Sequence, residues 1–282
     1  MEFVTLGNGV EMPMVGYGVY QVEPAEAERC VADALSVGYR MVDTAQAYRN
    51  EEGVGAAVKA SGLKREEVFL VSKVWISNYG EAKAAASIDE SLRKLQTDYI
   101  DLMLLHQPFC DRYGAYRALE AALKAGKVRA IGVSNFYPDH LIDLASNVEV
   151  PPMVNQVETH VFCQQAVSRK YMAEFGCRPM SWGPLAEGRN GLFSNPVLAA
   201  VGQAHGKSVA QVALRFLLQS GVIIIPKSTH KERMAENLAV LDWRLTADEM
   251  AQIQALDTGR SLFFDHHDGE VTKMFMGWRN LA

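Results

Sequence analysis

The amino-acid sequence predicts an α/β fold, a closed (β/α)8 TIM barrel with an N-terminal β-hairpin and a C-terminal tail over the mouth of the barrel. Short apolar, β-branched runs alternate with amphipathic, Ala-rich stretches at intervals of about 25 to 35 residues, the spacing of βα units. Eight such units fit into the 282 residues, and no linker rich in Pro, Gly and Ser divides them. We therefore expect residues 1–282 to form a single closed barrel rather than an open, doubly wound sheet.

The elements are expected in a regular order along the chain. The dipeptide Asn8-Gly9 suits a tight turn with positive φ values and predicts the opening hairpin. Strands are expected over Met14–Val19, Arg40–Thr44, Val68–Val74, Tyr99–Leu105, Val128–Val133, Val154–Val157, Arg178–Ser181 and Val222–Ile225. Helices are expected over Pro24–Ser36, Glu51–Ser61, Gly80–Leu95, Ala115–Ala125, Pro138–Ser146, Gln164–Phe175, Ser208–Ser220 and Lys231–Leu241. An extra helix over Ala247–Leu256 precedes the tail from Asp257 to Ala282, whose aromatic residues predict that it packs over an opening.

Composition and charge argue against several classes of protein. A chain with 49% hydrophobic and 22% charged residues can bury a large core, so it is not disordered. Its 28 basic and 33 acidic residues are interspersed along the sequence, so we expect no broad basic face of the kind that a nucleic-acid-binding protein uses. No apolar run reaches a membrane span of roughly 18 to 20 residues, and the start does not resemble a signal peptide. We expect a cytoplasmic protein without membrane contact, and a monomer, because no heptad pattern indicates a partner.

Polar residues follow the predicted strands at their carboxyl ends, where the side chains of a barrel converge on one face. Asp43, Lys73 and His106 come at the ends of three successive strands, and Tyr48 lies in the loop after Asp43. Each residue alone has an ordinary structural explanation, since Asp commonly begins turns and a Lys leaving a strand reaches solvent. The four together predict a catalytic group.

Together, these four side chains could donate a proton to a carbonyl oxygen without the help of a metal ion. An adjacent ammonium lowers the pKa of a phenol toward the neutral range, so Lys73 is expected to activate Tyr48 as a general acid. Asp43 would keep Lys73 charged, and His106 would donate a hydrogen bond to the substrate oxygen or help to relay its proton. Proton donation is half of a carbonyl reduction, and the hydride for the other half requires a nicotinamide cofactor.

The segment from Ile225 to Asn237 is the expected site for the phosphates of that cofactor. It starts at the end of the eighth strand and opens a helix, where free amides and the helix dipole bind anions. Lys227, Ser228 and Arg233 can all face one phosphate there. The alternative is an ordinary helix cap with a solvated basic turn. No G-x-G-x-x-G follows the first strand, so a Rossmann-type site is not indicated.

Three segments resemble signatures of the aldo-keto reductase family, and the resemblance runs nearly the full length of the chain. The segments are Gly38–Tyr48, Gly126–Phe136 and Ile225–Asn237. Within the family the chain resembles bacterial, short-tailed members, the 2,5-diketogluconate reductases. The resemblance implies NADPH-dependent reduction of aldehydes and ketones, with Tyr48 as the general acid supported by Asp43, Lys73 and His106. It also implies cofactor contacts by Ser134, Asn135, Gln156, Trp182, Leu185, Lys227, Ser228, Arg233, Glu236 and Asn237.

Several positions depart from the family pattern or concern the substrate pocket. Gln107 follows His106 where many members have Trp, Val161 stands where Pro is usual, and Gly183 replaces a common Ser. Gln107 therefore alters the pocket wall, and Tyr20 and Trp75 are the candidates for its aromatic walls. The tail is short for the family, which implies a more open pocket with broad acceptance of carbonyl compounds.

Two other functions stay open from the sequence. Lys73 at a strand end is a candidate for a Schiff base in a lyase, although Asp43 would hold it protonated. A catalytically silent relative that senses nucleotide is the second alternative. We expect no metal, because the close residues Asp265–Asp268 lack a distant third ligand and more readily form a lid contact.

Overall fold

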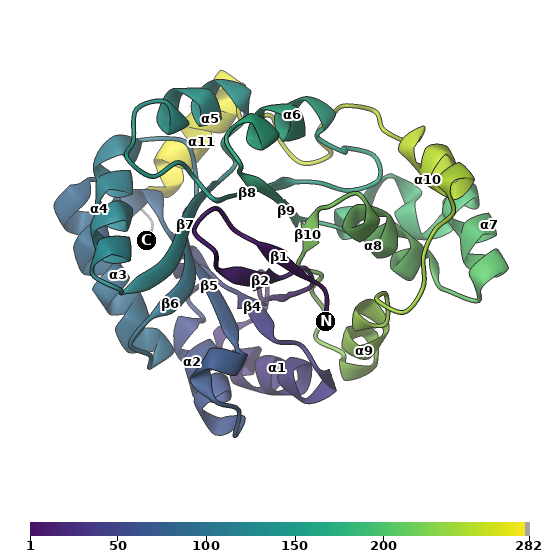
Figure 1. Cartoon of the computed structure of the whole chain (residues 1–282), viewed down its shortest axis with the longest axis horizontal. Helices are drawn as coiled ribbons and strands as arrows, with labels where there is room; N and C mark the ends of the chain where they lie inside the picture. Colours follow the sequence, from purple (N-terminus) through teal and green to yellow (C-terminus); the bar gives the residue numbers. More distant parts are fainter. Residues whose placement is uncertain (280–282) are drawn as a thin grey trace.

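Eight parallel strands lie side by side in their order along the chain in the computed structural model, which describes residues 1–279. These strands are β3 (Tyr17–Gly18), β4 (Met41–Asp43), β5 (Phe69–Val74), β6 (Ile100–Leu105), β7 (Val128–Ser134), β8 (Val154–Glu158), β9 (Arg178–Trp182) and β10 (Ile223–Ile224). Gly16 N donates to the Ile224 oxygen at 2.8 Å, and Ile224 N donates to the Met14 oxygen at 2.9 Å. The last strand thus pairs with the segment that leads into the first, and the predicted (β/α)8 barrel is confirmed (Figure 1).

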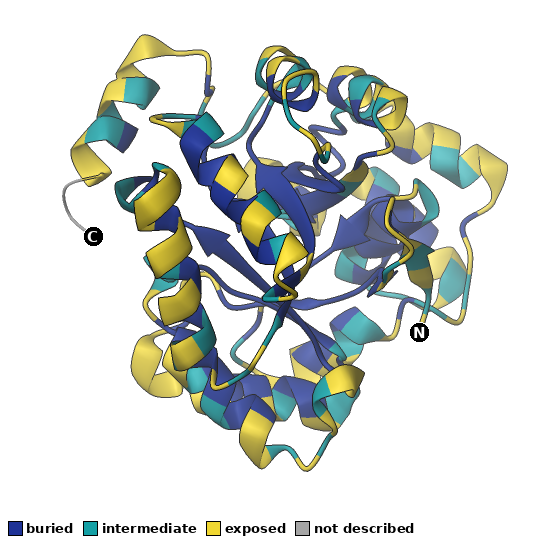
Figure 2. Ribbon diagram, turned by 60° about the vertical axis from the view of Figure 1, so that its left-hand side comes forward, coloured by how far each residue is buried: buried dark blue, intermediate teal, exposed yellow. Residues whose placement is uncertain are grey.

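The helices surround the strands, and each helix has one side buried against the rest of the protein. They are α1 (Pro24–Val37), α2 (Glu51–Ala60), α3 (Glu81–Leu95), α4 (Arg112–Lys124), α5 (Pro138–Ala145), α6 (Ala166–Glu174), α7 (Pro196–His205), α8 (Val209–Gln219), α9 (Lys231–Leu238), α10 (Ala247–Gln254) and α11 (Gly269–Trp278). In α3 the buried residues Ala84, Ile88, Ser91 and Leu95 recur every three or four positions, as one helix face requires. Figure 2 shows exposed residues on the outer sides of the helices and buried strands inside. No helix within residues 1–279 is both long and apolar enough to cross a membrane.

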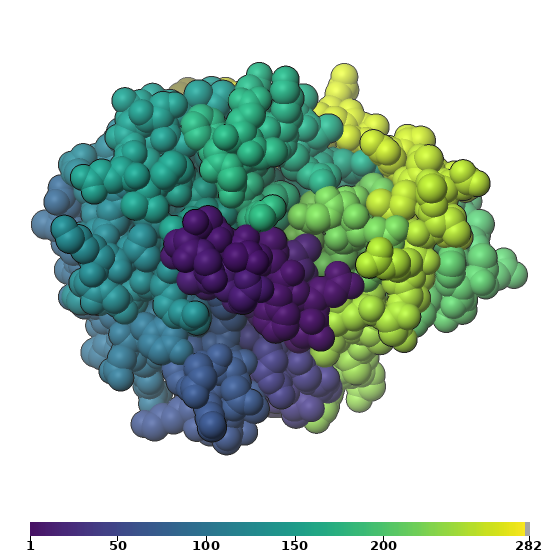
Figure 3. Space-filling model, in the orientation of Figure 1, coloured from purple at the N-terminus to yellow at the C-terminus, as the bar shows by residue number. Residues whose placement is uncertain are grey.

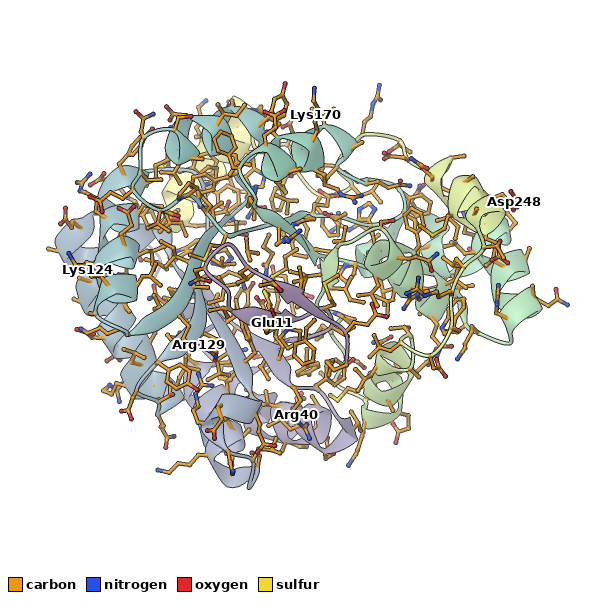
Figure 4. All side chains as sticks on the ribbon, viewed as in Figure 1. Glu11, Arg40, Lys124, Arg129, Lys170 and Asp248 are labelled. Carbon is orange, nitrogen blue, oxygen red and sulfur yellow. The ribbon has the colours of Figure 1, made fainter. Side chains whose placement is uncertain are left out.

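The N-terminal hairpin closes the end of the barrel at which the strands begin. Its strands β1 (Phe3–Thr5) and β2 (Glu11–Pro13) pair antiparallel. The hairpin lies across the middle of the barrel in Figures 1 and 3. Asn8 Nδ2 in its turn donates to the oxygen of Arg129, near the start of β7, at 2.8 Å. Figure 4 shows Glu11 over the middle of this end and Arg129 beside it.

Two helices occur where none is predicted from the sequence. The insertion after β9 contains α7, which begins at Pro196 after Asn195, whose side chain accepts from the amides of Val197 and Leu198. The tail contains α11, in which Phe275 is the buried residue. Val271, Met274, Phe275 and Trp278 nevertheless stand at helical spacing, so this helix is one that the sequence pattern could have revealed.

Candidate active site

A cavity of about 970 Å³ opens at the carboxyl ends of the strands. Many of the residues that the sequence proposes for the site line it: Tyr20, Asp43, Tyr48, Trp75, His106, Gln107, Ser134, Asn135, Gln156, Trp182, Leu185 and Lys227. Lys73 is fully buried and does not line the cavity. The residues further along the last loop and helix lie outside this lining: Ser228, Arg233, Glu236 and Asn237.

A buried ion pair lies beside the cavity. Asp43 ends β4, and Lys73 on the adjacent β5 lies two residues beyond Val71, the register partner of Asp43. Lys73 Nζ is 2.6 Å from Asp43 Oδ1 and 2.8 Å from the oxygen of Thr44. Gln156 Nε2 donates to Asp43 Oδ2 at 2.9 Å. Burial raises the pKa of Asp43 and lowers the pKa of Lys73, while the attraction between the two charges opposes both shifts.

Tyr48 lies in a 3₁₀ turn, Gln46–Tyr48, above this pair. Its Oη is 3.4 Å from Lys73 Nζ, and the same nitrogen is 4.9 Å from the centre of the Tyr48 ring. Burial, and next the negative charge of Asp43, raise the pKa of Tyr48 well above its usual value. The pKa of Tyr48 is therefore not lowered as expected, because burial of the phenol dominates and Asp43 offsets the charge of Lys73 at close range. The phenol stays protonated at neutral pH and has a proton to give.

His106 follows β6 and contacts two aromatic rings of the cavity wall. Its ring centroid is 5.6 Å from that of Tyr48 and 5.0 Å from that of Trp75, both with the rings edge to face. Burial, and next the charge of Lys73, lower the pKa of His106 well below its usual value, so the ring is neutral at pH 7. Nδ1 is buried without a hydrogen-bond partner in the described structure. The proton of the neutral ring therefore belongs on Nε2, which can donate to a ligand.

A chain of hydrogen bonds joins the ends of β7, β8 and β9 to His106. Ser134 Oγ donates to the oxygen of Gln156 at 2.8 Å. Asn135 Nδ2 donates to the oxygen of His106 at 3.1 Å, and Trp182 Nε1 donates to Asn135 Oδ1 at 2.8 Å. An indole beside side-chain amides and a hydroxyl is a surface on which a planar ring that bears an amide can bind.

Two basic side chains lie near the start of α9. Lys227 and Arg233 are exposed, and neither forms an ion pair within the described part of the chain. Tyr17 Oη donates to the oxygen of Ser228 at 2.6 Å, which holds the loop between them against the barrel. The first turn of α9 has no side-chain cap, so its amides are available to an anion. Ser208 Oγ, at the N-cap of the neighbouring helix α8, donates to Glu236 Oε1 at 2.5 Å.

The C-terminal tail supplies site residues that the sequence analysis does not name. Phe263, Phe264, Phe275 and Trp278 line the cavity, so the tail packs over the opening as predicted. The ring centroids of Phe263 and Phe264 are 5.1 and 6.0 Å from that of Trp182. The aromatic composition of the tail is the signal that predicts its packing, but composition alone does not place individual residues.

Glu158, at the end of β8, anchors this tail and is also absent from the predicted site. Its buried carboxylate lies 3.0 Å from His160 Nε2, and it accepts from Ser261 Oγ at 2.5 Å and from Leu262 N at 2.8 Å. A carboxylate inside a buried strand, two residues after Gln156, is the signal that could have identified it. Among residues 1–279 there is no group of three His, Cys, Asp or Glu side chains arranged to hold a metal ion.

The mouth of the barrel brings a protonated tyrosine and a neutral histidine to one cavity wall, above a buried Asp–Lys pair. This arrangement can donate protons to a small ligand in the cavity. Comparison with known proteins identifies the family. Residues 6–258 match the model of the Aldo/keto reductase family, and the chain belongs to this family of oxidoreductases.

Individual relatives resemble the chain over most of its length. It is 47% identical over 258 residues to the glyoxal reductase of Bacillus subtilis, covering 91% of this chain and 93% of that protein. An aldo-keto reductase from a Medee basin deep-sea metagenome library has a similar structure, with a TM-score of 0.91 and 39% identity, covering 94% of this chain and 98% of that one. The Bombyx mori aldo-keto reductase, solved in complex with NADP, has a TM-score of 0.88 and 31% identity, covering 96% of each chain.

Proposed function

We propose that the protein reduces aldehydes and ketones to alcohols with NADPH, and that Tyr48 is the general acid. The observation that carries this proposal is the placement of Tyr48 and His106 on one wall of the cavity, with Lys73 Nζ 3.4 Å from Tyr48 Oη. Tyr48 has the proton that a carbonyl oxygen must gain, and the neutral His106 has an N–H to orient that oxygen.

The residues at the mouth fit a nicotinamide dinucleotide phosphate. Trp182, Asn135, Ser134 and Gln156 would hold the nicotinamide, and Leu185 would contact the pyrophosphate. The unpaired side chains of Lys227 and Arg233, with Ser228, would take the 2′-phosphate, while Glu236 and Asn237 would lie near the adenine. NADPH supplies a hydride to the carbonyl carbon when it is bound.

The remaining chemistry belongs to the side chains of the chain itself. As negative charge develops on the substrate oxygen, Tyr48 donates its proton and becomes a phenolate. The Lys73 ammonium stabilises this phenolate, and Asp43 keeps Lys73 charged at 2.6 Å. His106 donates from Nε2 to the same substrate oxygen and fixes its position.

The position of Lys73 weakens the Schiff-base alternative. A Schiff base needs an amine that a carbonyl compound can reach. Lys73 is fully buried, does not line the cavity and is bonded to both Asp43 and the oxygen of Thr44.

The relatives direct the choice of substrate. A Bacillus subtilis relative named glyoxal reductase, at 47% identity, supports small, reactive aldehydes as substrates. The predictions of a single domain, a monomer and a cytoplasmic location accompany this proposal.

The test is the loss of NADPH absorbance, and separately of NADH absorbance, with methylglyoxal and with a simple aromatic aldehyde. We expect wild type to oxidise NADPH faster than NADH. Tyr48→Phe should lower turnover by about 10²- to 10⁴-fold, because it removes the acidic proton. NADPH binding, measured by fluorescence titration, should persist in this variant.

Each other outcome has a definite meaning. A fully active Tyr48→Phe variant would remove Tyr48 from the role of general acid. If wild type binds NADPH but never oxidises it with any carbonyl compound, the nucleotide-sensing alternative is correct. Borohydride trapping of a substrate adduct on Lys73 would instead establish the lyase.

A further inference from the structure

Gln107 occupies the cavity wall directly after His106, and its backbone is held independently of its side chain. Tyr79 Oη donates to the oxygen of Gln107 at 2.7 Å and accepts from Gln107 N at 3.1 Å. Gln107 is only 5% exposed, and both it and His106 line the cavity. A change of the Gln107 side chain therefore leaves the hydrogen bonds that position this loop intact.

A histidine of the C-terminal tail orients the amide of Gln107. His266 Nε2 lies 2.9 Å from Gln107 Oε1, although the two residues are 159 positions apart. Burial lowers the pKa of His266 to about 4, so its ring is neutral at pH 7. Its Nδ1 is buried without a partner in the described structure, and a proton there would be an unsatisfied buried donor. The proton is therefore on Nε2, which donates to Gln107 Oε1.

This hydrogen bond leaves the amide nitrogen of Gln107 available. Nε2 makes no hydrogen bond with the described residues, yet it is not among the buried polar atoms that lack a partner. Since Gln107 is nearly buried and lines the cavity, its Nε2 reaches solvent through the cavity. The aromatic rings of Trp75 and Phe275 line the same cavity and offer this donor no side-chain acceptor.

We propose that Gln107 Nε2 donates a hydrogen bond to a second oxygen of the substrate, so that the site prefers carbonyl compounds with a hydroxyl or carbonyl oxygen on the adjacent carbon. This inference deepens the proposed function and rests on it. The reacting oxygen is held by Tyr48 and His106, and Gln107 is the next residue along the chain. A neutral amide donor suits a neutral acceptor oxygen. His266 is a positioning residue, because it acts only through Gln107.

The test compares substrates with and without the second oxygen in wild type and in Gln107→Leu. The pairs are methylglyoxal with propanal, for a second carbonyl, and hydroxyacetaldehyde with acetaldehyde, for a hydroxyl. Within each pair, the ratio of the two kcat/KM values removes what the variant does to both substrates alike. We expect this ratio to fall about fivefold in Gln107→Leu for at least one pair, as the loss of one hydrogen bond requires.

Two further variants strengthen the test. Gln107→Glu keeps the shape of the side chain but replaces the donor by an acceptor, so the ratio should fall at least as far. It also serves if Gln107→Leu does not fold. His266→Phe keeps an aromatic ring in the tail but removes the orienting N–H, and it should lower the same ratio by a smaller factor. A purely structural role of His266 would not change a ratio between two substrates.

The outcomes separate this inference from the proposed function. If wild type reduces neither these four compounds nor the simple aromatic aldehyde, the proposed function and this inference both fail. If it reduces only the aromatic aldehyde, the inference alone is overturned. If wild type reduces the four compounds and the ratio in both pairs is the same in Gln107→Leu or Gln107→Glu as in wild type, the inference alone is overturned. A fall in only one pair supports it and identifies the second oxygen as carbonyl or hydroxyl.

Discussion

The two ends of the barrel are built from the same strands but have opposite chemistry. At the end where the strands begin, the hairpin and the residue after it contribute buried apolar side chains such as Leu6, Met12 and Met14 to the core. At the other end, the buried Asp43 and Lys73 lie beside a cavity of about 970 Å³. Substitutions at the closed end should therefore change the stability of the protein without changing its activity, whereas substitutions at the mouth should affect both stability and activity.

The largest effect is expected at the mouth, from Asp43→Ala. This variant leaves the fully buried Lys73 without its counter-charge. We expect the free energy of unfolding to fall by about 3 to 5 kcal/mol and carbonyl reduction to be lost. Urea unfolding and NADPH oxidation measure the two effects.

The double variant Asp43→Leu with Lys73→Met is the matched control. It removes both charges, so it should recover most of the stability without recovering activity. An Asp43→Ala protein as stable as wild type would contradict the view that this ion pair is needed to keep Lys73 buried.

A smaller and purely structural effect is expected at the closed end. Met12 on strand β2 of the hairpin is fully buried, and Met12→Ala should lower the free energy of unfolding by about 3 kcal/mol. Because Met12 is far from the mouth along the barrel axis, kcat/KM should stay within about twofold of wild type. Phe3→Ala on the same hairpin is the control, since Phe3 is 54% exposed and its loss should cost less than about 0.5 kcal/mol. A large kinetic effect of Met12→Ala would show that the two ends are coupled.

The smallest effect concerns the tail that covers the mouth. Burial lowers the pKa of His266 to about 4, below its usual value near 6.5. Between these values the unfolded chain binds the proton more readily, so the free energy of unfolding is full above about pH 6.5 and falls as the pH decreases toward 4. At pH 5 the loss amounts to about 2 kcal/mol. Urea unfolding of wild type and His266→Phe at pH 7 and pH 5 should reveal it, because the variant lacks this component. Equal pH dependence in both proteins would contradict the assignment.

The parts of the molecule that could be predicted from the sequence are those that one geometric rule governs. In a parallel barrel all strands end on one face, so residues such as Asp43, His106 and Asn135, far apart in sequence, could be assigned to one site. Alternation of apolar runs with helical stretches likewise sufficed for the eight strands.

What could not be predicted depends on contacts that no period encodes. The bond between Gln107 and His266 joins a loop to a tail whose path over the mouth is set by the Glu158 anchor. The pKa of Tyr48 is raised rather than lowered as expected, because its value depends first on how deeply the hydroxyl is buried and then on how closely Asp43 offsets Lys73. The Gln107–His266 hydrogen bond and the pKa of Tyr48 both depend on the three-dimensional arrangement of residues that are distant in sequence.

The Glu158 anchor also bears on the order in which the protein matures during synthesis. Ser261 and Leu262, which supply two of the donors to its carboxylate, leave the ribosome after the residues of all eight strands. A nascent chain can thus complete its sheet while Glu158 still lacks these partners and the aromatic cover of the mouth is missing. The eight strands are therefore synthesised before the segment that completes the binding site, and a chain interrupted before Ser261 would lack both donors to Glu158 and the aromatic cover of the mouth.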